Sequence, residues 1–196
     1  SFGSSVTFDS SSSYRTRLLV SGDANCSCVA IEFEREEVSY AYVDKAFKRV
    51  RTVPLGRLKN ARSVQLAVSA DGGSLVAGAR IYYSAGVYSG GVQFYDRNYD
   101  GSWSATQFFA GNYNGGDPTT VAMRSRTLAV VGGRLEFSHG IRIYRRKYSW
   151  YSWSLSQKLL PTSSQEWLVK HVALHGKTLV VGTESNTLVY EEGSNG

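Results

Sequence analysis

Short apolar runs that close on a glycine recur four times along this chain. They read "RLLVSG", "SLVAGA", "TLAVVG" and "TLVVG", and the closing glycines are Gly22, Gly78, Gly132 and Gly182. Successive glycines are 56, 54 and 50 residues apart, and regular spacings of this kind are typical of repeat domains. The pattern predicts four repeat units, at about residues 2–56, 57–112, 113–163 and 164–193.

Each unit is predicted to begin with three strands. A short apolar strand comes first, "SVTF", "VQLAV", "TVAM" or "HVAL", and the glycine-terminated run follows as the second strand. Nearly unbroken apolar runs of this length are expected of strands that are buried on both faces. The third strands, "VAIEFE", "GVQFYD", "IRIYRR" and "TLVYEE", alternate apolar with polar residues and should have one sheltered face.

A fourth strand follows in "SWSATQFF" and "YSWSLSQKL", and a looser version lies within "VSYAYVDKAFKRV". The run "YSWSLS" has a strict period of two. Such alternation is typical of an outer strand with one wet face. The chain of 196 residues, 42% hydrophobic, suits a single domain. Four-stranded meanders at this period predict an all-β fold, a β-propeller of four-stranded antiparallel blades, with a β-sandwich as the alternative.

The first unit opens with "FGSSV" at Phe2 and Gly3, and the second unit's apolar run closes as "LVAGAR". Together with "GVQFYDRNYDGSW" and "IRIYRRKYSWYSWSLSQKL", these segments resemble FG-GAP repeats, the blades of integrin-α-type propellers. The resemblance covers about the whole chain, although Arg80 replaces the proline of the GAP signature and the other units keep only the glycine. It implies a propeller that usually has seven blades, of which this chain shows four.

The expected ring is therefore open. The fourth unit stops after its third strand, and only residues 1–4 precede the first strand, too few to supply the missing outer one. Unpaired sheet edges tend to pair with other molecules. We expect further blades, a second copy of the chain or another subunit to cover these edges.

The motifs predict no cofactor, no metal and no catalytic group. FG-GAP proteins often carry an aspartate-rich calcium turn between the first and second strands, but the turns here offer one carboxylate at most, and calcium takes about six to eight oxygen ligands. Residues 96–101 begin like an EF-hand loop, but Gln107 stands at the twelfth position, so a hairpin turn is the better interpretation. The three histidines and the pair Cys26 and Cys28 lack partners at the spacing that zinc requires.

The net charge of +6 favours acidic partners, such as polyanionic glycans, phosphorylated surfaces or nucleic acid. Basic residues gather in "KAFKRVRTVPLGRLKNAR", and Arg145, Arg146 and Lys147 lie beside aromatic residues in "YRRKYSWYSW". Basic residues next to stacking rings fit nucleic-acid binding. A solvated turn followed by an outer strand with a packed tryptophan is the alternative interpretation.

We expect the binding surface on loops at one end of the propeller. The loops between second and third strands, and those between units, should emerge together there, and loops on a rigid scaffold often bind partners. Tyrosine, tryptophan and arginine, which interfaces enrich, are frequent in these loops, and the longest of them, residues 81–90, should carry the partner. The predicted partner-binding residues are Tyr82, Tyr83, Tyr88, Arg80, Tyr113, Trp167, Arg57, Lys59 and Arg62.

These features predict a non-catalytic interaction module, an adhesion or assembly scaffold that binds a protein or glycan at the cell surface or outside the cell. Two alternatives stay open: a propeller that binds polyanions or nucleic acid, and a propeller enzyme, a lyase or hydrolase with a metal or carboxylate cluster at its axis. No apolar stretch reaches the roughly 18 to 20 residues of a membrane span, so no membrane span is expected.

Overall fold

The computed structural model describes residues 6–12, 15–21, 28–36, 48–54, 56–58, 61–84, 87–110, 117–135, 138–160 and 169–193. These residues form fifteen strands and no helix, so the all-β prediction is confirmed. A helix able to cross a membrane is accordingly absent from the part of the chain that the structure describes.

The strands form four antiparallel sheets in which neighbours along the chain are also neighbours in the sheet. The first sheet contains β1 (Val6–Ser12), β2 (Arg15–Ser21), β3 (Cys28–Glu36) and β4 (Lys48–Pro54). The second contains β5 (Ala61–Val68), β6 (Ser74–Ser84), β7 (Val87–Arg97) and β8 (Trp103–Ala110). The third contains β9 (Asp117–Ser125), β10 (Leu128–Leu135), β11 (Ser138–Arg145) and β12 (Ser154–Leu159), and the fourth β13 (Val169–His175), β14 (Thr178–Thr183) and β15 (Thr187–Glu191).

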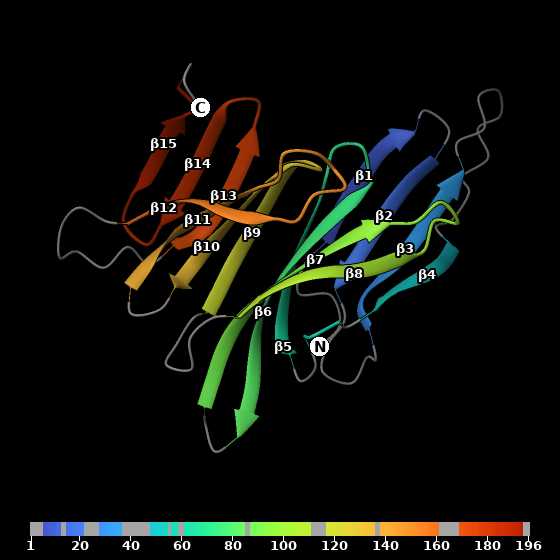
Figure 1. Cartoon of the computed structure of the whole chain (residues 1–196), viewed down its shortest axis with the longest axis horizontal. Helices are drawn as coiled ribbons and strands as arrows, with labels where there is room; N and C mark the ends of the chain where they lie inside the picture. The colour runs from blue at the N-terminus through green and yellow to red at the C-terminus, as the bar shows by residue number, and fades with distance from the viewer. Residues whose placement is uncertain are drawn as a thin grey trace.

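The four sheets lie side by side in chain order, from blue to red in Figure 1. The first strand of each sheet packs against the sheet before it: β5 against β1 and β2, β9 against β5, β6 and β7, and β13 against β9, β10 and β11. Among the described residues, no comparable contact joins the fourth sheet back to the first. The described sheets therefore form an open series, and the outer face of the fourth sheet has no sheet against it.

Burial follows from this stacking. Val76 of β6 belongs to the apolar cluster shared with the third sheet, whereas its neighbours Leu75 and Ala77 belong to the cluster shared with the first sheet. This confirms that β6 is buried on both faces, as the unbroken apolar run predicts. The equivalent strand of the fourth sheet, β14, buries Leu179 and Val181 but leaves Val180 half-exposed, because only one of its faces is covered.

Gly132, which closes the apolar run of the third sheet, leaves room for the next sheet. A Cβ atom built on Gly132 would lie 2.7 Å from Val169 Cγ1 and 3.1 Å from Val172 Cγ1, both on β13. Glycine in a strand often marks a place where another backbone approaches closely. At Gly182, the same position in the fourth sheet, the nearest atom to such a Cβ is His171 Cβ at 3.6 Å, because none of the four described sheets packs against that face.

Residues 81–90 are not the long loop that we predicted. β6 and β7 continue through this segment as one hairpin, in which Tyr82 pairs with Tyr88 and Arg80 with Gly90. The hairpin projects beyond the other sheets at the bottom of Figure 1. Tyrosine and isoleucine favour strands, and here that preference outweighed the glycines and serines that indicated a loop.

Candidate functional site

A group of aromatic side chains is exposed in the turn between β11 and β12. Trp150 is 78% exposed, Tyr151 51% and Tyr148 44%. The rings of Tyr148 and Trp150 are stacked, with centroids 5.0 Å apart, and the Lys147 ammonium lies 5.4 Å from the Tyr148 ring centre. We call these four residues the aromatic turn.

The aromatic turn begins directly after a buried arginine that binds it to the second sheet. The side chain of Arg146 is 2% exposed and donates two hydrogen bonds to the Asp96 carboxylate, at 2.8 and 2.9 Å. Its remaining donors go to the Ser74 hydroxyl, at 2.8 Å, and to the Arg126 carbonyl. A forked, charge-assisted pair of this kind fixes direction as well as distance.

A buried tryptophan fixes the other side of the turn. Trp153 stacks on Phe94 of β7, with ring centroids 4.3 Å apart, and the Arg146 guanidinium lies 4.6 Å from its ring centre. The Gln107 side chain accepts a hydrogen bond from the Trp153 backbone N–H at 2.6 Å and donates one to the Trp153 backbone carbonyl at 2.8 Å. The exposed rings therefore lie between two anchored residues.

Exposed aromatic side chains on a rigid support are typical of binding surfaces. A ring that is already ordered loses little conformational entropy when a partner covers it, and tryptophan and tyrosine often dominate interface energetics. The rings can stack on sugars, bases or other aromatic groups, and Lys147 can pair with an acidic group beside them.

An open cleft of about 640 Å³ lies at the same end of the sheets. The turn between β7 and β8 and the turns that follow β5 and β9 form it, and the Arg146 contact to Arg126 connects it to the aromatic turn. Its charged lining residues are Arg51, Arg97, Arg126, Asp71 and Asp100. Tyr99, fully exposed, is the aromatic residue of its lining.

The two aspartates of the cleft are held in the ionised form. Burial alone would raise the pKa of Asp71, but the Ser69 hydroxyl, the Gly73 N–H and Arg126, whose Nε lies 2.6 Å from the carboxylate, together lower it below its ordinary value. Hydrogen bonds from the hydroxyl and the N–H of Ser102 lower the pKa of Asp100. Arg97 is also paired with the buried Glu32 at 2.7 Å, so the three arginines of the cleft face three carboxylates and their charges balance.

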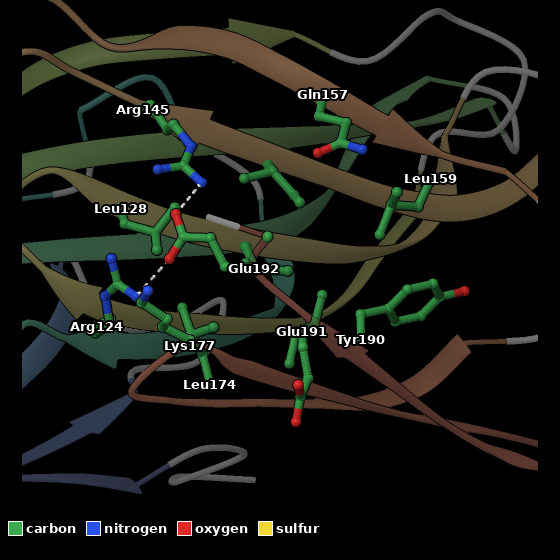
Figure 2. Close-up of a pocket in the computed structure, with 14 residues that line it drawn as sticks. Arg124, Leu128, Arg145, Gln157, Leu159, Leu174, Lys177, Tyr190, Glu191 and Glu192 are labelled. Atoms are coloured by element: carbon green, nitrogen blue, oxygen red, sulfur yellow. Dashed lines mark hydrogen bonds and ion pairs between the residues drawn. The ribbon is translucent and has the colours of Figure 1, made fainter. Parts of the chain in front are cut away.

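A second, mainly apolar pocket of about 230 Å³ lies between the third and fourth sheets. Leucine, valine and isoleucine side chains line its floor, together with Tyr190 of β15, while Gln157 projects from β12 (Figure 2). We call this space the inter-sheet pocket.

Charged residues close one side of the inter-sheet pocket. Glu192 pairs with Arg145 at 2.6 Å and with Arg124 at 3.1 Å, as the dashed lines in Figure 2 show. Hydrogen bonds from Arg145 and then Arg124 lower the pKa of Glu192. By strand register, Arg145 and Glu192 occupy the positions of Asp96 and Arg146 one sheet earlier, so this ion pair is the same contact with its charges exchanged.

The structure places the predicted site residues as follows. Arg80, Tyr82, Tyr83 and Tyr88 lie on the β6–β7 hairpin, at the opposite end of the sheets from the aromatic turn. Arg57 is exposed next to β4, and Arg62 lies within β5. Tyr113, Trp167 and Lys59 lie outside the described residues.

The aromatic turn was missed as a site, although its sequence was noted. "YRRKYSWYSW" allows two interpretations: a basic and aromatic binding segment, or a solvated turn followed by an outer strand with a packed tryptophan. The tryptophans agree with the second, because Trp153 is buried just before β12 and Trp150 is exposed in the turn. The sequence alone does not show which rings the turn exposes, because that depends on where β12 begins.

The predicted hairpin at residues 96–101 is confirmed. The Asn98 backbone N–H donates to the Ser102 carbonyl at 2.8 Å, and Gly101 has a φ of 80°. The Asp96 carboxylate accepts hydrogen bonds from Arg146. Within the described ranges, no three His, Cys, Asp or Glu side chains are grouped as metal ligands would be. Comparison with protein-family models and with curated proteins finds no match to this chain.

Proposed function

We propose that this chain is a non-catalytic interaction module that binds an acidic glycan or protein through the aromatic turn and the cleft beside it. The exposed, stacked rings of Tyr148 and Trp150 between the buried anchors Arg146 and Trp153 carry the proposal. Solvated aromatic rings cost free energy in isolation, and partners that cover them recover it.

We further propose that the four sheets are blades of a β-propeller of the FG-GAP type, acting in adhesion or assembly at the cell surface or outside the cell. Three features support this architecture: the antiparallel meander of each sheet, the packing of each first strand against the preceding sheet, and the spacing of the closing glycines. The uncovered face of the fourth sheet, where Val189 is 62% exposed, supports further blades or a partner there.

Acidic partners are favoured by charge. The chain carries a net charge of +6, and Lys147 places part of that charge beside the rings. The same arrangement favours nucleic acid as a second candidate, because bases stack on aromatic rings while arginines bind phosphates. The probe that binds separates the two, because the affinity of any polyanion, glycan or nucleic acid, falls as salt concentration rises.

The test is a titration with three probes: a heparin-derived hexasaccharide, poly-glutamate and a single-stranded oligothymidylate, each at low and at physiological salt. The variant Tyr148→Ser/Trp150→Ser/Tyr151→Ser removes the aromatic turn without changing buried residues. Leu155→Ser, which removes an exposed side chain from the adjacent strand β12, is the matched control.

The proposed function is supported if wild type binds the sugar or the acidic polypeptide, the triple variant binds it with at least tenfold lower affinity, and the control binds it as wild type does. Exclusive binding of the oligonucleotide, with a steep salt dependence, assigns the surface to nucleic acid instead. Equal affinity of wild type and triple variant for every bound probe contradicts a role of the aromatic turn.

A further inference from the structure

The inter-sheet pocket has a filled counterpart one sheet earlier. Strand register relative to the closing glycines makes residues of the second and third sheets equivalent to residues of the third and fourth. Between the second and third sheets, Phe94, Phe109, Met123 and Tyr144 pack in one cluster with Trp153. Their equivalents line the inter-sheet pocket, and they are Ile143, Leu159, Leu174 and Tyr190.

The part of the fourth sheet that the structure describes contains no counterpart of Trp153. That tryptophan immediately precedes the outer strand β12, whereas the described fourth sheet contains three strands and ends at β15. Within the described residues, the lining of the pocket is therefore repeated, and the tryptophan that fills it is not.

Gln157 indicates that a backbone belongs beside the pocket. Its equivalent, Gln107, binds both the N–H and the carbonyl of Trp153. Gln107 pairs with Phe94 in the second sheet, and Gln157 pairs with Ile143 in the third. The Gln157 amide extends toward the pocket in Figure 2 and makes no hydrogen bond with the described residues.

The size and polarity of the pocket suit a single large side chain. Its volume of about 230 Å³ is below the roughly 300–1,000 Å³ of pockets that hold whole small-molecule ligands. Glu192, on the charged side, also provides an acceptor for an indole N–H, since a carboxylate accepts several hydrogen bonds. Trp103 shows the same preference, because its Nε1 donates to Glu32 at 3.2 Å.

We propose that the inter-sheet pocket receives a tryptophan from a β-strand of a partner polypeptide, which pairs with the outer edge of β15 as the fourth strand of the fourth sheet. The occupant is chosen by continuity with the site that Trp153 fills. Strand addition of this kind gains affinity from main-chain hydrogen bonds and specificity from a side chain in a pocket. The inference concerns a different surface from the aromatic turn and does not depend on the proposed function.

The experiment uses the full chain and a labelled synthetic peptide, YSWSLSQKLL, which copies residues 151–160. Fluorescence anisotropy should show saturable binding, and a peptide with alanine in place of its tryptophan should bind at least tenfold more weakly. Gln157→Ala in the protein should weaken binding about tenfold, because two hydrogen bonds to the peptide backbone are lost. Gln157 is exposed, so its replacement leaves the fold intact, and Ser156→Ala on the same strand should change affinity less than twofold.

Hydrogen exchange locates the bound peptide independently: the amide hydrogens of β15 should exchange more slowly in the complex, and those of β12 should not change. Equal binding of the tryptophan and alanine peptides would overturn the proposal. So would the absence of saturable binding, which would mean that another part of the chain already fills the pocket. If the protein self-associates and Gln157→Ala weakens this self-association, the pocket belongs to a second copy of the chain, and the proposal is also overturned.

Discussion

Replacing Gly132 with alanine tests whether the closing glycines exist to admit the next sheet. The new Cβ would lie 2.7 Å from Val169 Cγ1, 3.0 Å from Thr120 Cγ2 and 3.1 Å from Val172 Cγ1. Carbon atoms attract best at about 3.5–4.0 Å, so all three contacts would be repulsive. Val169 is completely buried and cannot turn away into solvent, so the two sheets must separate slightly.

Overpacking of this kind costs about 1–3 kcal/mol. For a chain of this length, that loss lowers the melting temperature by about 2–4 °C for each kcal/mol. Gly182→Ala is the matched control, since it makes the same chemical change at the same position of the fourth sheet, with its nearest contact at 3.6 Å. There the reduced freedom of the unfolded chain should leave stability unchanged or raise it by up to about 1 kcal/mol.

Urea and thermal unfolding of the two variants, beside the wild type, give the comparison. The expected result is a clear loss for Gly132→Ala and none for Gly182→Ala. Equal effects at Gly132 and Gly182 would refute the idea that the glycine serves sheet-on-sheet packing. A marked loss at Gly182 alone would show that its face is covered in solution.

Two further predictions concern charged groups. Arg146→Met should destabilise the protein by about 3 kcal/mol, because Asp96 loses its forked partner. Arg145→Met should cost less than about 1 kcal/mol, because its ion pair is partly exposed. Chemical denaturation measures both losses, and similar losses would contradict the difference in burial. The pKa of Asp71 is lowered, so its ion pair with Arg126 stabilises the fold above the ordinary aspartate pKa and is lost as pH falls through the pKa of the folded state. The stability difference between wild type and Asp71→Asn should therefore shrink below about pH 4 in a pH series of thermal melts, and a constant difference would count against this reasoning.

The repeat pattern was enough to predict the strands and their order. Glycine-terminated apolar runs identified β6, β10 and β14, and a strict period of two identified β12, because local periodicity reports which faces are covered. The position of residues 81–90 could not be predicted, since tyrosine, serine and glycine there are compatible with both a loop and a twisted hairpin.

The candidate sites depend on contacts between sheets, and these carry weak local signals. Nothing near Arg146 in the sequence shows that Asp96, fifty residues earlier, will bind it and so fix the aromatic turn. The inter-sheet pocket becomes visible only when Ile143 and Tyr190 are compared with Phe94 and Tyr144 in register. Long-range pairing decides both features, whereas composition and periodicity describe one strand at a time.

The central claim, that the aromatic turn binds an acidic partner, is tested most directly by the indole N–H signals in a ¹H–¹⁵N NMR spectrum during titration with the heparin-derived hexasaccharide or poly-glutamate. Trp150 is exposed, whereas Trp103 and Trp153 are buried, so their signals distinguish the surface from the core. The account predicts a saturable shift of the Trp150 signal, with those of Trp103 and Trp153 nearly unchanged. The account is contradicted if a probe binds and the Trp150 signal does not shift. It is also contradicted if the signal does not shift at high concentrations of either probe.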